Sequence, residues 1–176
     1  MTTLPFRMKP PLLPAEALRR TLRLARMDGI SVLAIAGAFA LISGAARDLG
    51  GAAVGLLVAA AGAAELHGVT LIRNGFGSGV RWLIGSQLYL MIVIFAYVGY
   101  RLGHIDIGPM RALLKDDQRA VIQQANLTED EFLIAVYRIA YDAVALATLL
   151  YQGGMALYYR RRRAPILAAL KEAAAA

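Results

Sequence analysis

The chain has 176 residues, of which 59% are hydrophobic and only 18% are charged, and its formal net charge is +7. A soluble domain is usually about 45–50% apolar and about 25% charged, so this composition favours a membrane protein. The length fits one domain and excludes a large multidomain enzyme. The absence of cysteine excludes disulfides, thiolate metal sites and a cysteine nucleophile.

Four apolar stretches approach or exceed the length of about 20 residues that a helix needs to cross a bilayer. They cover residues 29–46, 49–72, 82–100 and 132–159. The predicted fold is therefore all-α, a single four-helix transmembrane domain with tails at 1–28 and 160–176 and an outer loop at 101–131. A cleaved signal peptide in the first stretch is kept as a minor alternative.

The distribution of Lys and Arg predicts the orientation of these spans. Of the 19 basic residues, 13 lie in the two tails and the loop between spans 2 and 3, and five lie on the other side. Cytoplasmic segments carry this excess in membrane proteins, so both termini are predicted to be cytoplasmic. The chain is expected to cross a cell membrane several times, and the expected membrane is a bacterial inner membrane.

Residues 15–27 have the pattern of a basic amphipathic helix, with Leu18, Leu22 and Ala25 on one face. This pattern predicts a helix lying on an anionic leaflet, and the alternative is an ordinary basic flank that is helical. Contacts with anionic lipid head groups are expected of the following arginines: Arg19, Arg23, Arg26, Arg160, Arg161, Arg162 and Arg163. Nucleic-acid binding is not expected, because the basic residues flank spans and do not form a stripe with interleaved aromatics.

The outer loop is predicted to hold a second amphipathic helix, which begins at Gly108-Pro109 and ends near Ala125. Thr128 and Glu131 have the spacing of a capping box at the start of the helix that contains span 4. Glu129, Asp130 and Glu131 could collect cations at an outer mouth in a ring of subunits. The alternative is that acidic side chains favour this helix N-terminus because of its dipole.

Small residues recur every four positions in the first two spans and predict a tight antiparallel hairpin. The two rows are Ala36, Ala40 and Gly44 in span 1, and Gly51, Gly55, Ala59 and Ala63 in span 2.

The residues after Arg163 are expected to form only a short frayed helix.

Polar residues inside the spans are the candidate functional residues, because an intramembrane charge usually faces a partner or a water path. Glu65, Gln87 and Gln152 are predicted to lie at one level of the inner half, with His67 nearer the cytoplasmic rim. Glu65 and His67 do not share a helix face, so we expect no metal site from this pair. A hydrogen-bonded neutral carboxyl is the structural alternative for Glu65.

Arg138 and Asp142 lie four residues apart in the outer half of span 4, where they can neutralise each other. They are either a structural ion pair or part of a polar ion path. Trp82, Tyr100, Tyr158 and Tyr159 are expected to be interfacial aromatics at span ends.

The composition and these residues favour a small homo-oligomeric membrane channel, with an ion path between subunits lined by the polar span residues. The alternative is a non-conducting membrane scaffold or a partner subunit of a larger complex. We expect no enzyme, no cofactor and no metal site, since neither HExxH nor GxSxG occurs.

Overall fold

The computed structural model describes residues 13–124 and 126–175, which form an all-α fold. Its helices are α1 (Pro14–Ala45), α2 (Leu49–Arg73), α3 (Gly79–Gly103), α4 (Gly108–Ala112), α5 (Asp116–Gln124) and α6 (Glu129–Ala175). Four of them, α1, α2, α3 and α6, are long and apolar enough to cross a membrane. The prediction of an all-α membrane protein with four spans is confirmed.

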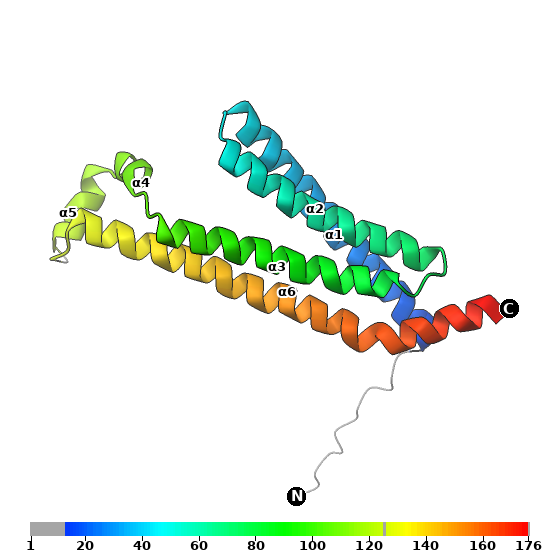
Figure 1. Cartoon of the computed structure of the whole chain (residues 1–176). Helices are drawn as coiled ribbons and strands as arrows, with labels where there is room; N and C mark the ends of the chain where they lie inside the picture. The colour runs from blue at the N-terminus through cyan, green and yellow to red at the C-terminus, as the bar shows by residue number, and fades with distance from the viewer. Residues whose placement is uncertain (1–12, 125, 176) are drawn as a thin grey trace, which may run out of the picture.

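The four long helices form two antiparallel pairs, α1 with α2 and α3 with α6, which diverge toward one end of the molecule (Figure 1). The largest cluster of buried apolar side chains lies at the other end and draws on all four helices. It comprises Ala25, Val69, Ile72, Val80, Leu83, Met155, Tyr159 and Ile166. We call this the basic end, because Arg19, Arg23, Arg26 and Arg73 lie there with the C-terminal part of α6.

The predicted α1–α2 hairpin is present, and its turn is short. Arg47 adopts a left-handed backbone conformation (φ 59°), and the Asp48 side chain accepts a hydrogen bond from the Gly51 amide at 2.9 Å. The two helices come closest at Gly55 and Gly62 of α2. An added Cβ would lie 2.8 Å from the Cβ of Ala40 at Gly55 and 2.7 Å from the Leu33 nitrogen at Gly62. The contacting row in α2 thus reaches Gly62 and not the predicted Ala63, because a helix has about 3.6 residues per turn and a row of every fourth residue drifts.

The basic flank at residues 15–27 is not a separate surface helix, because α1 runs without interruption from Pro14 to Ala45. Leu18, Leu22 and Ala25 do share a face, as predicted, but this face packs on the protein core. The N-terminal half of α1 therefore belongs to the four-helix bundle, and its arginines are exposed.

The C-terminal tail is also more ordered than predicted, since α6 continues through Pro165 to Ala175. Ile166 is fully buried and Ala169 is buried, so the segment packs on the core. Its red end turns away from the axis of the preceding helix in Figure 1, as expected where a proline removes a backbone hydrogen bond.

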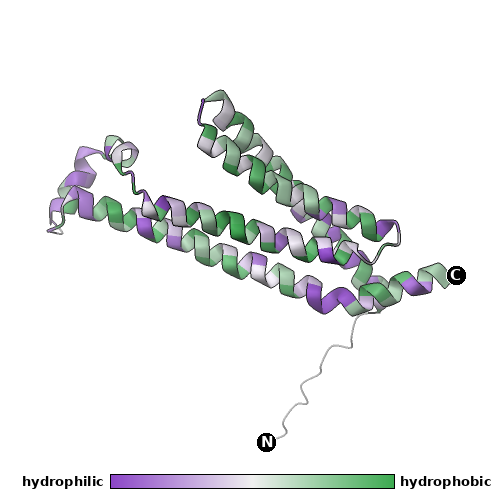
Figure 2. Ribbon diagram, in the orientation of Figure 1, coloured by the Kyte–Doolittle hydropathy of each residue, from purple (hydrophilic) through white to green (hydrophobic). Residues whose placement is uncertain are grey.

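The single helix predicted in the outer loop is instead two helices, α4 and α5, separated by residues 113–115. Pro109 lies in the first turn of α4, as predicted. The second helix begins at Asp116 and Asp117, whose charges favour a helix N-terminus. Figure 2 shows the hydrophilic residues of α5 beyond the more apolar long helices.

Candidate functional site

Polar side chains from all four long helices are buried next to the core of the basic end. We call Asp28, Glu65, Gln87, Tyr151, Gln152 and Tyr159 the buried polar cluster. The Asp28, Glu65, Gln87 and Gln152 residues are 7%, 2%, 1% and 7% exposed, and Tyr159 is fully buried. Tyr151 is largely exposed, although its hydroxyl reaches into the cluster.

Asp28 on α1 accepts hydrogen bonds from two other helices. The Gln87 Nε2 on α3 donates to Asp28 Oδ2 at 3.0 Å, and the Tyr151 hydroxyl on α6 donates to Asp28 Oδ1 at 2.8 Å. These contacts tie α1 to the α3–α6 pair. Both donors are neutral, so they satisfy the carboxyl oxygens without supplying a positive charge.

Glu65 on α2 accepts a hydrogen bond of 2.6 Å from the Tyr159 hydroxyl on α6. Asp28 and Gln87 also lie close to the Glu65 carboxyl. Two carboxyl groups therefore share one buried site. Among the described residues, neither of them forms an ion pair with Lys, Arg or His.

The two glutamines leave acceptor atoms without partners. The Oε1 atoms of Gln87 and Gln152 are both buried, and neither has a hydrogen-bond partner within the described chain. A buried polar atom without a partner costs about 1–3 kcal/mol. The cluster is therefore rich in oxygen acceptors and short of donors and positive charge, which is the composition of a site for a proton or a cation.

A cavity of about 470 Å³ adjoins this cluster between the two helix pairs. Gln152 lines it together with Ser31, whose hydroxyl donates to the Asp28 carbonyl at 2.8 Å. The rest of the wall is mainly apolar and includes Phe39, Val58 and Ile94. The cavity is thus lined by one member of the buried polar cluster, Gln152.

The structure buries Glu65, Gln87 and Gln152, the three residues predicted at one level, and brings Gln87 close to Glu65. His67 is exposed on another face of α2 and contacts Trp82 edge-on, with ring centroids 4.8 Å apart. The difference in face between Glu65 and His67 follows the expected helical spacing.

Arg138 and Asp142 are exposed on α6, and no ion pair joins them in the part of the chain that the structure describes. The neighbouring Tyr141 instead faces α3, where its hydroxyl accepts a hydrogen bond of 3.0 Å from Arg101 Nε. The ring centroids of Tyr97 on α3 and Tyr141 are 6.1 Å apart.

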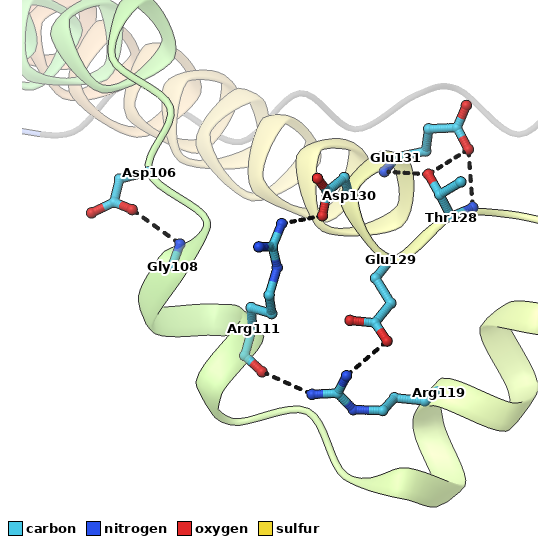
Figure 3. A network of polar contacts seen from close by, with 8 residues as sticks. All are labelled: Asp106, Gly108, Arg111, Arg119, Thr128, Glu129, Asp130 and Glu131. Carbon is cyan, nitrogen blue, oxygen red and sulfur yellow. Dashed lines mark hydrogen bonds and ion pairs between the residues drawn. The ribbon is translucent and has the colours of Figure 1, made fainter.

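The loop acidic group, Glu129, Asp130 and Glu131, has partners of its own (Figure 3). Arg111 pairs with Asp130, and Arg119 Nη1 contacts Glu129 Oε1 at 2.8 Å. The predicted capping box is present: the Thr128 amide donates to Glu131 Oε2 at 3.0 Å, and the Glu131 amide donates to Thr128 Oγ1 at 3.2 Å. These contacts account for all three acidic side chains through local structure.

The arginines expected at lipid head groups fall into two sets. Arg19, Arg23 and Arg26 are exposed on α1 and line a cavity together with Arg73. Arg160, Arg161 and Arg163 are exposed on α6, and the Arg162 guanidinium lies 5.6 Å from the Tyr158 ring centre.

Sequence reasoning missed three members of the cluster. Asp28 was read as the boundary of span 1, although that span was short and its extension toward the N-terminus would have included Asp28. Tyr159 was read as an interfacial aromatic, which is wrong, because it is fully buried and bonded to Glu65. Tyr151 carried no distinguishing signal, since its position among apolar residues is common for tyrosine.

As for metal ligands, no group of three or more His, Cys, Asp or Glu side chains gathers within the described ranges. Asp28 and Glu65 supply two carboxyls, and Gln87 and Gln152 add buried amide oxygens to the cluster. Such an oxygen set suits a proton or a hard cation more than a transition metal.

Fold and site together define an all-α membrane protein of four spans with a buried polar cluster contributed by every span. Comparison with models of protein families, with curated proteins and with solved structures gave no match.

Proposed function

We propose that the protein conducts protons or small cations across a membrane, along a path built around the buried polar cluster. The observation that carries this proposal is the pair of carboxyls from Asp28 and Glu65, which are buried and, within residues 13–124 and 126–175, accept hydrogen bonds from neutral donors and form no ion pair. Intramembrane ionisable residues mark ion and proton paths in many membrane proteins.

The chemistry of the cluster supports a positively charged substrate. A buried carboxylate without a cation is costly in a low-dielectric surrounding, and a proton or cation that binds there removes much of the cost. The Oε1 atoms of Gln87 and Gln152 have no partner among the described residues, so they can coordinate a hard cation or accept a hydrogen bond from water or hydronium.

The cavity between the two helix pairs supports access to the cluster. It is lined by Gln152, which follows Tyr151 in α6, and by Ser31, whose hydroxyl donates to the Asp28 carbonyl one turn earlier in α1. This arrangement favours a path inside one chain. We therefore propose a path inside one chain in place of a path between subunits, since Glu65, Gln87 and Gln152 are buried and Arg138 and Asp142 are exposed.

The orientation and location that the basic residues predict complete the proposal. We propose that both termini lie in the cytoplasm and that the membrane is the inner membrane of a bacterium. The basic end, and the buried polar cluster beside it, would then lie nearer the cytoplasmic side.

Flux into proteoliposomes tests this function. We expect the wild-type protein to carry protons, Na⁺ or K⁺ down an imposed gradient. We expect Glu65→Gln to reduce the flux by about tenfold or more, because the neutral amide removes about 1.4 kcal/mol or more of cation binding. Asp142→Asn is the control, because it removes an exposed carboxyl from a membrane-spanning helix outside the cluster and should leave the flux within about twofold, or about 0.4 kcal/mol.

Absence of flux at all voltages and pH values tested would contradict the proposal. Equal loss in Glu65→Gln and Asp142→Asn would show that the cluster has no special part in conduction.

A second candidate function is a non-conducting scaffold or partner subunit, and one observation favours it. Arg138 and Asp142 are charged, exposed and four residues apart on a membrane-spanning helix, so a second helix could shield both of them from lipid. This helix could come from a second copy of the chain or from another membrane protein. Loss of a defined oligomer in an Arg138→Leu/Asp142→Leu variant, with flux absent in wild type, would support the scaffold.

A further inference from the structure

A second cavity, independent of the buried polar cluster, lies at the basic end between the first half of α1, the end of α2 and the C-terminal segment of α6. Its volume is about 710 Å³. Four arginines line it, three from one face of α1 and one from the end of α2. They are Arg19, Arg23, Arg26 and Arg73.

The positive charges of this cavity lack acidic partners within the chain. None of the four arginines forms an ion pair with a residue that the structure describes. The nearby Glu16 is paired with Arg20, which does not line the cavity. Four like charges around one cavity repel each other unless an anion lies between them, so the cavity is complementary to a negatively charged group.

The remaining wall is apolar, and its shape is elongated along α1. Leu18, Leu22, Met27 and Ile30 line it from α1. On the facing side, α6 presents only Ala169 and Ala173, whose small side chains leave room in the wall. From Ala15 to Ile30 the helix rises by about 22 Å, which exceeds the roughly 15 Å of one leaflet's hydrocarbon.

We propose that this cavity binds one anionic phospholipid, with its phosphate among Arg19, Arg23, Arg26 and Arg73 and an acyl chain along Met27 and Ile30. Arginine matches phosphate in charge and in its fork of donors. Leu22 and the two alanines of α6 add apolar contacts to the wall of the cavity that the arginines line. The bound lipid would join α1, α2 and the C-terminal segment of α6 at the basic end.

A specific lipid site differs from general attraction of basic flanks to a membrane. In a specific site, only the arginines that line the cavity contribute to lipid binding, whereas in general attraction every exposed arginine contributes. Arg160, Arg161 and Arg163 provide the comparison. They are exposed like Arg19, Arg23 and Arg26, but they do not line this cavity. A general surface effect would treat the two sets alike.

The test is thermal unfolding of the full chain in a neutral detergent. Three additions are compared: phosphatidylglycerol, phosphatidylcholine with the same acyl chains, and inorganic phosphate. We expect phosphatidylglycerol to raise the midpoint by about 5 °C, because a ligand that binds only the folded state stabilises it. We expect phosphatidylcholine or phosphate alone to shift it by less than about 1 °C.

The variant Arg19→Gln/Arg23→Gln/Arg26→Gln should lose the shift, while Arg160→Gln/Arg161→Gln/Arg163→Gln should keep it. A second variant, Ala15→Leu/Ala173→Leu, fills the cavity at two exposed positions without changing its charge, and it should lose the shift as well. This second variant keeps the test valid if the triple variant does not fold.

Three results would overturn the proposal. An equal shift with phosphatidylcholine would mean that only the acyl chain binds. A shift with phosphate alone would mean a free-anion site, and equal loss in the two triple variants would mean diffuse charge attraction.

Discussion

The molecule has two acidic regions that differ in what surrounds the carboxyl groups. Asp28 and Glu65 are buried among neutral donors, and they come from two helices. Glu129 and Asp130 are at the far end of the chain's fold, next to each other in sequence, and each pairs with an arginine of the outer loop. Arginines therefore neutralise Glu129 and Asp130, whereas Asp28 and Glu65 have no counter-charge among the described residues.

This difference separates a structural role from a candidate chemical one. An exposed ion pair contributes about 0–1 kcal/mol and closes a loop onto a helix. A buried carboxyl without a cation costs free energy, so its presence calls for a substrate, a proton or another compensation. Glu129, Asp130 and Glu131 are prominent in the sequence because they are consecutive, but they say less about function than Asp28 and Glu65 do.

The largest effect on cation flux is expected when a positive charge is added next to Asp28 and Glu65, so that these carboxyls are neutralised as Glu129 and Asp130 are. Gln87→Lys places an ammonium group beside Asp28, at the position from which Gln87 Nε2 now donates at 3.0 Å. We expect cation flux in proteoliposomes to fall by about tenfold or more, since an internal cation competes with the substrate by about 1.4 kcal/mol or more.

Gln123→Lys is the control for Gln87→Lys, because it adds the same charge at an exposed position of α5. It should leave the flux within about twofold, or 0.4 kcal/mol. Gel filtration of both variants checks that they remain folded. Wild-type flux in a folded Gln87→Lys protein would contradict the role of the cluster as a cation site.

A smaller effect, on stability, is expected from Tyr159→Phe. This change removes the hydroxyl that donates to Glu65 Oε1 at 2.6 Å and leaves a buried carboxyl oxygen without this donor. We expect the free energy of unfolding to fall by about 1–3 kcal/mol, measured by denaturant titration in mixed micelles.

The neighbouring Tyr158→Phe is a matched control for Tyr159→Phe. The Tyr158 hydroxyl is 3.5 Å from Thr21 Oγ1, at the limit of a hydrogen bond, and Tyr158 is only half-buried. We expect a loss below about 0.5 kcal/mol. Equal losses in both variants would mean that the bond to Glu65 adds nothing to stability.

The fold was largely predictable from the sequence, because long apolar helices leave a strong signal in composition and hydropathy. The four spans and the capping box at Thr128 follow from local patterns of this kind. The split of the outer-loop helix was missed because the spacing of the apolar residues on both sides of Lys115, Asp116 and Asp117 fits one continuous helix. These three residues are instead at a break, where two aspartates favour a new N-terminus.

The candidate site was only partly predictable, because its members are brought together by packing between helices. Glu65 and Gln87 stand out as polar residues in apolar stretches. Asp28 did not, because a charge next to an apolar run is normally a boundary, and only the continuity of α1 places it inside the bundle. Tyr159 was assigned from its place at a span end, whereas its burial depends on the C-terminal segment of α6 that packs beyond it.

The smallest effect is expected in the loop acidic region, from Thr128→Ala. The variant loses the Thr128 Oγ1 acceptor for the Glu131 amide, and an N-cap of this kind contributes about 1 kcal/mol. Hydrogen exchange at the amides of the first turn of α6 should accelerate by about fivefold, as expected for about 1 kcal/mol of local stability.

Glu131→Gln is the control for Thr128→Ala, because glutamine also completes a capping box and should leave the exchange rates nearly unchanged. Neither variant should alter cation flux, since both act at the end of α6 remote from the buried polar cluster. A loss of flux in Thr128→Ala comparable with that in Gln87→Lys would remove the distinction between the two acidic regions, because a defect in a local cap would then act on conduction. Acceleration of exchange confined to the first turn, with normal flux, would instead place the role of the loop acidic group in helix initiation alone.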